Sequence, residues 1–265
     1  MHSFAVLGAT GNIGRAILQI LLDRGGDTIH AYCRSQEKLF HLFPNAETSR
    51  GLTIFQGELR DEALMDECLR KTDAVFLAVA IVDNMPGCTV AMQTAEAVVA
   101  SLKRLRATPG SHCPRLVMVS SASLEPSFCG DVPAPVHWVL KTAVSHLYRD
   151  LAAAEAFLRS QSGWLSTTFV KPGGLVHDQR RGHEVRLDRA HTPLSFLDLA
   201  AGMVEIAEAD DNRYHMENVS VVPTSKQVRF PWDGVYYAFT GLLFHFFPWT
   251  YRYLGEYPSA AKKTS

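Results

Sequence analysis

Cysteine is scarce in this sequence, and the few cysteines present are scattered. Five cysteines occur among 265 residues, and no two of them form a CxxC pair. An odd number of isolated thiols argues against a disulfide framework, and their spacing argues against a structural zinc site. The histidines are more numerous, but the spacings of His177, His183 and His191 do not match a helical metal-binding pair. We therefore expect no metal site.

Long hydrophobic runs and an excess of one charge sign are also missing. The longest apolar stretch, residues 235–249, is interrupted by Thr240, Gly241, His245 and Pro248, so it is too short and too broken to span a membrane. The first residues lack the basic region and cleavage site of a signal peptide. With 26 basic and 27 acidic residues, the chain has no general attraction to nucleic acid or to anionic lipid. We expect a cytoplasmic protein with no nucleic-acid partner and no membrane-spanning segment.

The remaining composition is that of an ordinary folded chain, with 47% hydrophobic and 20% charged residues. Apolar, β-rich segments alternate with segments of helical periodicity, which is typical of βαβ units. The expected strands are residues 3–7, 28–33, 52–56, 73–80, 115–120 and 164–171, and the expected helices are residues 15–24, 36–42, 61–69, 89–105 and 136–161. This alternation predicts an α/β fold, a Rossmann-type doubly wound parallel sheet with its ligand site at the carboxyl ends of the strands.

Three glycines punctuate the turn between the first strand and the first helix. Gly8, Gly11 and Gly14 are spaced as GxxGxxG, with an apolar strand before them and a helical pattern after them. Such glycines let the backbone turn tightly and approach a pyrophosphate, while the helix N-terminus supplies free N–H donors. A plain βα turn that needs glycine for its backbone conformation is the alternative. The context on both sides favours a dinucleotide site.

The residues that end the second strand indicate which dinucleotide is bound. An NAD site usually has an acidic residue here for the ribose hydroxyls, whereas an NADP site has an arginine for the 2′-phosphate. The strand ends at Arg34 and Ser35, with Lys38 one turn later, and no acidic residue occupies the position. Solvated surface charges are the alternative for Arg34 and Lys38. We predict NADP(H) as the cofactor, and Ser35 is also a suitable N-cap for the helix at residues 36–42.

The pattern changes after Gly174. Residues 177–191 are polar and are expected to form an exposed loop or hairpin, and residues 230–257 hold 12 of the 26 aromatic residues. We expect this aromatic segment to pack on the core, with a lid over a flat substrate, a homodimer face and a membrane-surface attachment as open alternatives. We expect one NAD(P)-binding domain over residues 1–265, with a Rossmann core at about 3–175 and C-terminal helical and aromatic additions on the substrate side at about 176–265.

Several segments together resemble the atypical short-chain dehydrogenases/reductases of the NAD(P)-binding, NmrA-like family. These segments are GATGNIGR at 8–15, CRS at 33–35, GELRD at 57–61, VFLAVA at 75–80, VMVSSAS at 117–123, the stretch at 152–175 that ends in KPGGL, and SFLDLAAGMVE at 195–205. Within the family, the sequence is similar to fungal polyketide-pathway oxidoreductases of the averufin-oxidase type. The resemblance covers residues 3–207.

The resemblance implies positions for the cofactor. The implied cofactor-binding residues are Gly8, Thr10, Gly11, Asn12, Ile13 and Gly14 at the pyrophosphate, Arg34, Ser35 and Lys38 at the 2′-phosphate, Glu58 and Leu59 at the adenine, Ala78, Val79 and Ala80 at the nicotinamide ribose, and Pro172, Gly173 and Gly174 near the nicotinamide, together with Ser120. Ser121 falls where the family has its catalytic Ser or Thr. Local hydrogen bonding in the turn is the alternative for Ser120 and Ser121.

The sequence departs from the family at the usual YxxxK pair. The tyrosine position is Tyr148, but Ala152 stands where the lysine is expected. The lysine normally lowers the pKa of the tyrosine, and an unassisted tyrosine, with a pKa of about 10, is a poor base at neutral pH. We nevertheless predict that Tyr148 points into the cofactor cleft and donates or accepts the proton.

His137 and Lys141 offer a second candidate pair with the same spacing. If residues 136–161 form one continuous helix, Lys141 and Tyr148 lie two turns apart on nearly one face. Lys141 would then have to bend back across roughly 10 Å of helix rise to reach the tyrosine. His137 is a candidate acid–base residue because its imidazole titrates near neutral pH.

These observations favour an NADP(H)-dependent oxidoreductase that acts on a hydrophobic, aromatic or polyketide-derived small molecule in secondary metabolism. A non-catalytic NADP(H)-sensing regulator of the NmrA kind is the runner-up, because the YxxxK lysine is missing. An isomerase, dehydratase or cyclase on the same scaffold is a third reading. The identity of the substrate, the direction of the reaction and the oligomeric state stay open.

Overall fold

The protein is represented by a computed structural model, and the description covers all residues except 82, 108–111, 129–132, 210–211, 226–231 and 256–265. The strands are β1 (Ser3–Leu7), β2 (Thr28–Cys33), β3 (Leu52–Gln56), β4 (Ala74–Leu77), β5 (Arg115–Val119), β6 (Thr167–Val170), β7 (Leu175–Val176), β8 (His183–Arg186), β9 (Leu194–Ser195) and β10 (Asn218–Pro223). The α-helices are α1 (Asn12–Arg24), α2 (Gln36–Leu42), α3 (Glu62–Leu69), α4 (Val90–Arg106), α5 (Ala134–Ala143), α6 (Ser145–Arg159), α7 (Phe196–Glu208), α8 (Trp232–Phe246) and α9 (Tyr251–Leu254).

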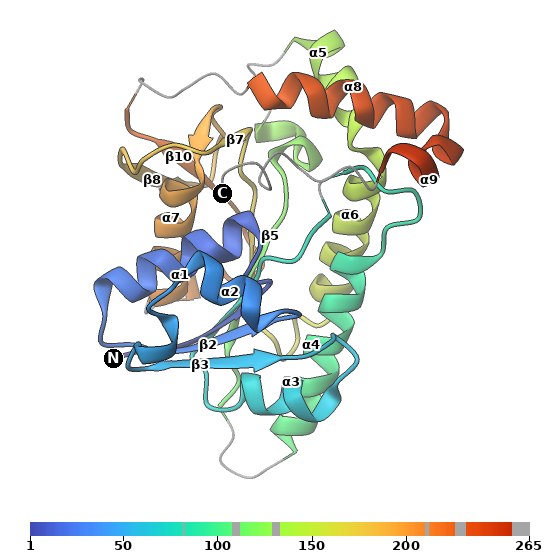
Figure 1. Cartoon of the computed structure of the whole chain (residues 1–265). Helices are drawn as coiled ribbons and strands as arrows, with labels where there is room; N and C mark the ends of the chain where they lie inside the picture. The colour runs from blue at the N-terminus through green and yellow to red at the C-terminus, as the bar shows by residue number, and fades with distance from the viewer. Residues whose placement is uncertain (82, 108–111, 129–132, 210–211, 226–231, 256–265) are drawn as a thin grey trace.

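The main sheet has the strand order β3-β2-β1-β4-β5-β6-β10-β8 (Figure 1). All neighbouring strands are parallel except β8, which runs antiparallel to β10. The order 3-2-1-4-5-6 is that of a dinucleotide-binding Rossmann sheet, in which the chain reverses its winding direction between β1 and β4. The predicted Rossmann-type α/β fold is therefore confirmed.

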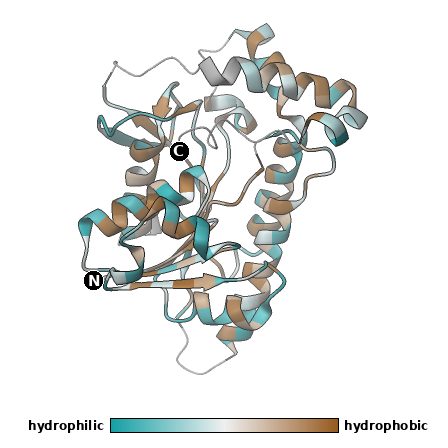
Figure 2. Ribbon diagram, in the orientation of Figure 1, coloured by the Kyte–Doolittle hydropathy of each residue, from teal (hydrophilic) through white to brown (hydrophobic). Residues whose placement is uncertain are grey.

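Helices cover both faces of this sheet because each central strand is apolar on both sides. On one face, Phe4 and Val6 of β1 pack with α1 and α7; on the other, Ala5 and Leu7 of the same strand pack with α3, α4 and α6. Figure 2 shows the strands between these layers coloured as hydrophobic. The carboxyl ends of the parallel strands, where a ligand would bind, meet at a single edge.

Several elements differ from the sequence prediction, and the strand expected at 164–171 is shortened to Thr167–Val170. The expected helix at 136–161 is wrong as a single element, because it ends at Ala143 and restarts at Ser145, with Val144 between them in a non-helical conformation. The strand expected at 73–80 is confined to Ala74–Leu77. The polar stretch at 177–191 contains β8, which forms the edge of the main sheet. Its polar side chains suit an edge strand that faces solvent.

The break at Val144 lets α5 leave the line of α6 and pack against the C-terminal helix α8 (Figure 1). The crossing is close, because a Cβ on Gly241 of α8 would lie only 2.0 Å from the carbonyl oxygen of Ala143. A glycine is required at this crossing for that reason. The described part of the aromatic segment therefore packs against α5 and the start of α6.

Candidate active site

The glycine-rich turn has the geometry that its spacing predicts. Gly8 has a positive φ of 83°, and a Cβ there would lie 2.6 Å from the carbonyl oxygen of Ala78 at the end of β4. A Cβ on Gly14 would lie 2.1 Å from the carbonyl oxygen of Gly8. These two glycines hold strand, turn and helix in close contact. Gly11 differs, because it is exposed and its added Cβ would come no nearer than 3.3 Å to another atom.

The N-terminus of α1 fits the pyrophosphate of a dinucleotide. Gly11 is the N-cap of α1 and has no side chain to cap it. The backbone amides of Asn12, Ile13 and Gly14 have no hydrogen-bond acceptor in the described part of the chain. Uncapped first-turn amides together with the positive end of the helix dipole form an anion site. Thr10 lies half-buried in the same turn.

Two cationic side chains follow β2 at the adenine end of the site. Arg34 and Lys38 are exposed, and neither side chain forms an ion pair within the described residues. The Ser35 hydroxyl accepts from the Lys38 amide at 3.1 Å, so Ser35 caps α2 as predicted. Arg34 therefore keeps its guanidinium available for an anionic group.

The turn that carries Glu58 and Leu59 is anchored by a buried tyrosine. The hydroxyl of Tyr32 donates to the carbonyl oxygen of Glu58 at 2.7 Å. Burial raises the pKa of Tyr32 to about 12, with Asp61, Cys68 and Glu58 adding to the effect. A hydroxyl that stays protonated is a constant donor, so this bond holds the turn in place. Glu58 is exposed and Leu59 is half-buried, as residues beside an adenine would be.

The segment after β4 lies next to the glycine-rich turn. Ala78 and Val79 are half-buried and Ala80 is exposed, and the added Cβ of Gly8 would touch both Ala78 and Val79. Further along this segment, the Asn84 side chain is buried. Its amide nitrogen donates to the carbonyl oxygen of Gly241 at 2.9 Å, and its amide oxygen accepts from the His146 backbone at 2.8 Å. Asn84 thereby connects this segment to α6 and α8.

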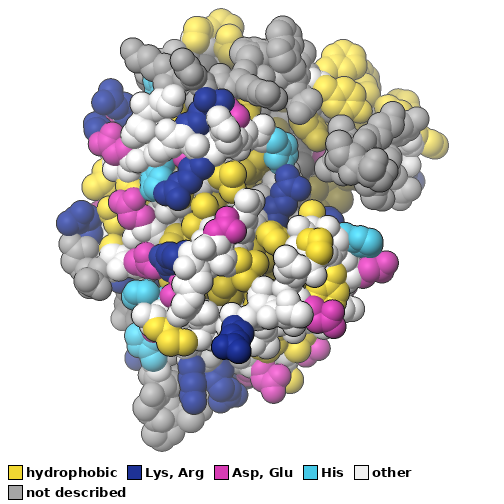
Figure 3. Space-filling model, turned by 60° about the vertical axis from the view of Figure 1, so that its left-hand side comes forward, with side chains coloured by type: hydrophobic (Ala, Val, Ile, Leu, Met, Phe, Trp, Pro, Cys, Tyr) yellow, Lys and Arg dark blue, Asp and Glu magenta, His cyan; other side chains and the backbone are white. Residues whose placement is uncertain are grey.

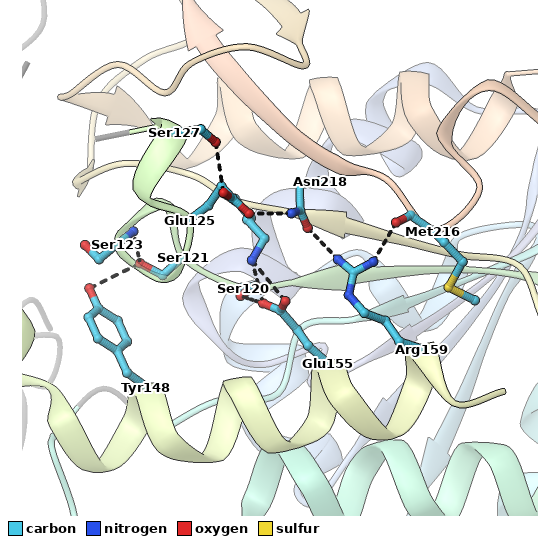
Figure 4. Close-up of polar contacts among 11 residues, drawn as sticks. Ser120, Ser121, Ser123, Glu125, Ser127, Tyr148, Glu155, Arg159, Met216 and Asn218 are labelled. Atoms are coloured by element: carbon cyan, nitrogen blue, oxygen red, sulfur yellow. Dashed lines mark hydrogen bonds and ion pairs between the residues drawn. The ribbon is translucent and has the colours of Figure 1, made fainter. Parts of the chain in front are cut away.

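The predicted chemical pair, Ser121 and Tyr148, is brought together by the fold. The two hydroxyl oxygens lie 3.1 Å apart in a hydrogen bond, with Ser121 just after β5 and Tyr148 on α6 (Figure 4). Ser121 also accepts from the Ser123 amide at 3.3 Å, and the next residue, Ala122, donates its amide to the Pro172 carbonyl at 2.9 Å. The serine, the tyrosine and the Pro172 turn therefore meet at the carboxyl ends of β5 and β6.

A buried ion pair lies behind this dyad. The Lys171 ammonium lies 2.9 Å from both carboxylate oxygens of Glu155, and Lys171 is only 2% exposed. The hydroxyl of Ser120 donates to the same carboxylate (Figure 4). Tyr148 and Glu155 are seven residues apart and project from the same face of α6. This cluster supports the neighbouring residues Ser121 and Pro172.

Ser120, which the resemblance implies as a cofactor-binding residue, has its side chain engaged within the protein. Ser120 is buried, and its hydroxyl donates a hydrogen bond to the Glu155 carboxylate. The sequence contains a signal for this cluster, which the prediction did not use. A lysine at the end of an otherwise apolar strand needs a carboxylate partner, because an unpaired buried charge is very costly.

The second candidate pair, His137 and Lys141, is not joined to Tyr148 by one helix. Both lie on α5, and the break at Val144 separates α5 from the helix that carries Tyr148. The expected arrangement, with Lys141 and Tyr148 on one face of a continuous helix, is therefore wrong. Lys141 is exposed, and it has no hydrogen bond or ion pair among the described side chains. The Nε2 atom of His137 is buried and has no hydrogen-bond partner in the same part of the structure.

One further contact was not expected from the sequence. The Arg15 guanidinium, one residue beyond the glycine-rich turn, lies 3.1 Å from Nδ1 of His177, just after β7. The His177 ring packs against Phe196, with centroids 4.6 Å apart. This contact connects the start of α1 to the segment that follows Pro172, Gly173 and Gly174. No spacing in the sequence indicates it, because the two residues are 162 positions apart.

The described residues favour neither a metal site nor a membrane span. They contain no cluster of three or more side chains suited to hold a metal ion. None of the helices formed by these residues is long and apolar enough to cross a membrane. The features at the carboxyl ends of the strands are those of a nucleotide site: tight glycines, free helix amides, an unpaired arginine and a Ser–Tyr dyad.

Comparison with known proteins agrees with this geometry. Residues 8–210 match the family model described as NAD(P)H-binding. The chain is 76% identical to oxidoreductase stcQ of Emericella nidulans, over 99% of this chain and 98% of that protein. It is 54% identical to oxidoreductase aflX of Aspergillus parasiticus and 47% identical to oxidoreductase ordB of Dothistroma septosporum, in both cases over 97% of each chain.

Solved structures share the fold at low sequence identity. A short-chain dehydrogenase/reductase from Veillonella parvula in complex with NADP has a TM-score of 0.66 and 18% identity, and the match covers 88% of this chain and 100% of that chain. A putative NADH-flavin reductase from Streptococcus pneumoniae has a TM-score of 0.58 and 20% identity, over 84% of this chain and 100% of that one. From the family match and the full-length fungal relatives, the chain belongs to the NAD(P)H-binding family and is an oxidoreductase of the group that those fungal proteins form.

Proposed function

We propose that this oxidoreductase uses NADP(H) to reduce or oxidise a hydrophobic, aromatic or polyketide-derived small molecule of secondary metabolism. The observation that carries the proposal is the hydrogen bond between Ser121 and Tyr148 at the carboxyl ends of β5 and β6. A hydroxyl pair at this edge lies where a Rossmann sheet exposes a bound dinucleotide. When bound, the nicotinamide supplies or accepts the hydride.

The preference for NADP(H) over NAD(H) rests on the end of β2. Arg34 is exposed and unpaired among the described side chains, and no carboxylate follows β2 at the position that would hold the ribose hydroxyls. A guanidinium binds a phosphate through two parallel hydrogen bonds, which a free ribose hydroxyl cannot match. Lys38, one turn further on, adds a second positive charge.

We assign the proton to Tyr148 and the orientation of its hydroxyl to Ser121. A hydroxyl bonded to a neighbouring hydroxyl has a fixed direction, and the serine can in turn bond a substrate oxygen. The Ser120–Glu155–Lys171 cluster holds the β5 end, α6 and the Pro172 turn together, so the dyad keeps its geometry when substrate binds. In this proposal Lys141 takes no part.

The rest of the chain completes the site. We propose that the chain is one domain, in which residues from about 176 to 265 form the substrate side of the Rossmann core. We also propose that the enzyme acts in the cytoplasm. Support for the single domain comes from α7, which packs on α1, and from α8, which is linked to the segment after β4 through Asn84. Aromatic residues supply large apolar area for a flat substrate.

The test is a comparison of hydride transfer with cofactor binding. Purified protein is incubated with NADPH or NADH and a series of aromatic polyketide ketones and quinones, and loss of the reduced cofactor is followed by absorbance. Substrate-dependent oxidation of NADPH, faster than that of NADH, is the expected result. Tight NADPH binding with product formation but no cofactor turnover would instead favour a non-redox reaction.

A further inference from the structure

The guanidinium of Arg15 has a neutral partner. It lies 3.1 Å from Nδ1 of His177, and among the described residues this is its sole hydrogen bond. Arg24, Arg104 and Arg181 each pair with a carboxylate instead. Arg15 is half-buried, and within the described part of the chain its positive charge has no anionic partner.

A carboxylate stands beside this contact but is used elsewhere. Asp178 follows His177 directly, and its side chain pairs with Arg181 at 2.9 Å. The first turn of α1, where Arg15 begins its side chain, contains no acidic residue. A guanidinium with this surrounding keeps its charge available for an anion that comes from outside the chain.

Arg15 projects over the N-terminus of α1. It lies four residues after Gly11, and its backbone amide donates to the Gly11 carbonyl at 2.9 Å. Side chains four residues apart share a helix face, and each leans towards the helix N-terminus. Gly11 has no side chain, so nothing on that residue separates Arg15 from the uncapped amides of Asn12, Ile13 and Gly14.

The contact with His177 gives the guanidinium a direction. His177 follows β7, which comes directly after the turn at 172–174 that is expected beside the nicotinamide. Its ring packs against Phe196 at the start of α7, and α7 packs on α1 (Figure 1). Figure 3, which brings this side of the molecule forward, shows basic and histidine side chains next to one another in its upper half.

This direction leads away from the adenine end of the site. Arg34 follows β2, whereas His177 belongs to the segment that continues from β6, and the sheet places β2 and β6 on opposite sides of β1. Arg15 is therefore held on the nicotinamide side of the glycine-rich turn. The pyrophosphate is the anionic group of a dinucleotide that lies at this turn.

We propose that Arg15 binds the pyrophosphate of the dinucleotide and that His177 holds the guanidinium in place for this contact. An arginine only donates hydrogen bonds, so Nδ1 of His177 is the acceptor and the ring carries its proton on Nε2. A guanidinium has five N–H donors, so a bond to His177 leaves others for phosphate oxygens. Arg15 touches the cofactor in this arrangement, and His177 is a positioning residue.

The inference concerns dinucleotide binding itself, so it depends on neither the substrate nor the NADP(H) preference proposed above. The full chain is titrated with NADPH and, in parallel, with NADH, and binding is followed by fluorescence. Arg15→Ala should weaken both cofactors about tenfold or more and by the same factor, because both contain the pyrophosphate. Arg15→Lys should lose less, because lysine keeps the charge without the planar fork.

The matched control is Arg70→Ala, which removes an exposed cation after α3 and should bind both cofactors like the wild type. Wild-type affinity of Arg15→Ala for both cofactors would overturn the proposal, as would a wild type that binds neither. A loss confined to NADPH would assign Arg15 to the 2′-phosphate and overturn it as well. Should Arg15→Ala melt below the titration temperature, Arg15→Gln, which keeps most of the aliphatic stem, takes its place.

A second cycle of variants isolates the role of His177. His177→Ala should weaken both cofactors about two- to tenfold, the range for immobilising one flexible side chain. In the Arg15→Ala background the same change should have no further effect, because no guanidinium is left to position. A His177→Ala effect that persists in that background would show that the ring acts independently of Arg15 and would overturn its positioning role.

Discussion

Lys171 and Glu155 form a buried ion pair in which one ammonium lies 2.9 Å from both oxygens of one carboxylate. The pair joins the end of β6 to the middle of α6, directly below the residues that would perform chemistry. A buried pair of this kind adds little net stability compared with apolar residues, but removal of one partner leaves an unpaired buried charge. Its value to this enzyme is the fixed position of Ser121, Tyr148 and Pro172.

We expect Lys171→Met to lower the free energy of unfolding by about 3–5 kcal/mol, because the Glu155 carboxylate would be left without its cation. The double variant Lys171→Met/Glu155→Gln should recover most of that loss. Urea denaturation of the three proteins measures both effects. A loss of less than about 1 kcal/mol for Lys171→Met would contradict the buried pair described here, since that is the range of an exposed pair.

Gly11 and Gly14 should respond differently to valine. Gly11→Val should abolish NADPH binding and leave the protein folded, because the side chain would enter the space that the pyrophosphate needs. Gly14→Val should unfold or strongly destabilise the protein, because its Cβ would lie 2.1 Å from the Gly8 carbonyl oxygen. Thermal unfolding and a fluorescence titration with NADPH distinguish the two. A Gly11→Val protein that binds NADPH normally would show that the turn is only structural.

Arg34→Asp should reverse the cofactor preference from NADPH to NADH. Each hydrogen bond to a charged group is worth about 1.5–3 kcal/mol, so the change in NADPH affinity should be roughly tenfold or more. Parallel titrations with the two reduced cofactors measure it. Arg70→Asp makes the same charge change at an exposed residue after α3 and should leave the preference intact. Equal affinities of the wild type for NADPH and NADH would refute the assignment.

Tyr148→Phe should slow turnover by about 10²–10⁴, the usual contribution of a general acid or base, with NADPH affinity near wild type. Ser121→Ala should have a smaller effect in the same direction, because the tyrosine hydroxyl keeps its place but loses its partner. Steady-state kinetics with the substrate found in the screen provide the measurement. If Tyr148→Phe stays active while His137→Ala or Lys141→Ala does not, the proton is carried from α5 instead.

His146 should make the fold less stable in mild acid. Burial lowers the pKa of this imidazole, with the charges of Arg149 and His245 acting in the same direction. Below about pH 6.5 the unfolded chain takes up a proton that the folded chain resists, so stability falls until the folded pKa is passed. Melting temperatures measured from about pH 7 to pH 5 should decline less in His146→Leu than in the wild type. Parallel pH profiles for the two proteins would rule out this residue.

The fold and the family were predictable because their signals are local and regular. A glycine-rich turn between an apolar strand and a helix, repeated βα alternation and the GATGNIG motif each depend on neighbouring residues. The family match and the sheet order confirm them. The capping of α2 by Ser35 is also a local signal, and the hydrogen bond from the Lys38 amide to the Ser35 hydroxyl confirms it.

The arrangement of the candidate site was only partly predictable. Helical periodicity continues through Val144, so the sequence gives no sign that α5 turns away from α6. The prediction that Lys141 and Tyr148 share one helix is wrong for this reason. Contacts such as Arg15 with His177 join residues far apart in the chain, where spacing carries no information. The roles assigned to Tyr148, Ser121 and Arg34 stay predictions until the variants are measured.

The Asn84 side chain has a consequence for protein engineering. One amide group binds Gly241 of α8 and the start of α6, and it lies six residues beyond Ala78. Both partner atoms belong to the backbone, so any residue at position 241, and any residue except proline at position 146, supplies them. A chimera that exchanges residues 232–255 with a relative should therefore keep this junction, provided that Asn84 stays and that a glycine remains at position 241, where a Cβ would lie 2.0 Å from the carbonyl oxygen of Ala143.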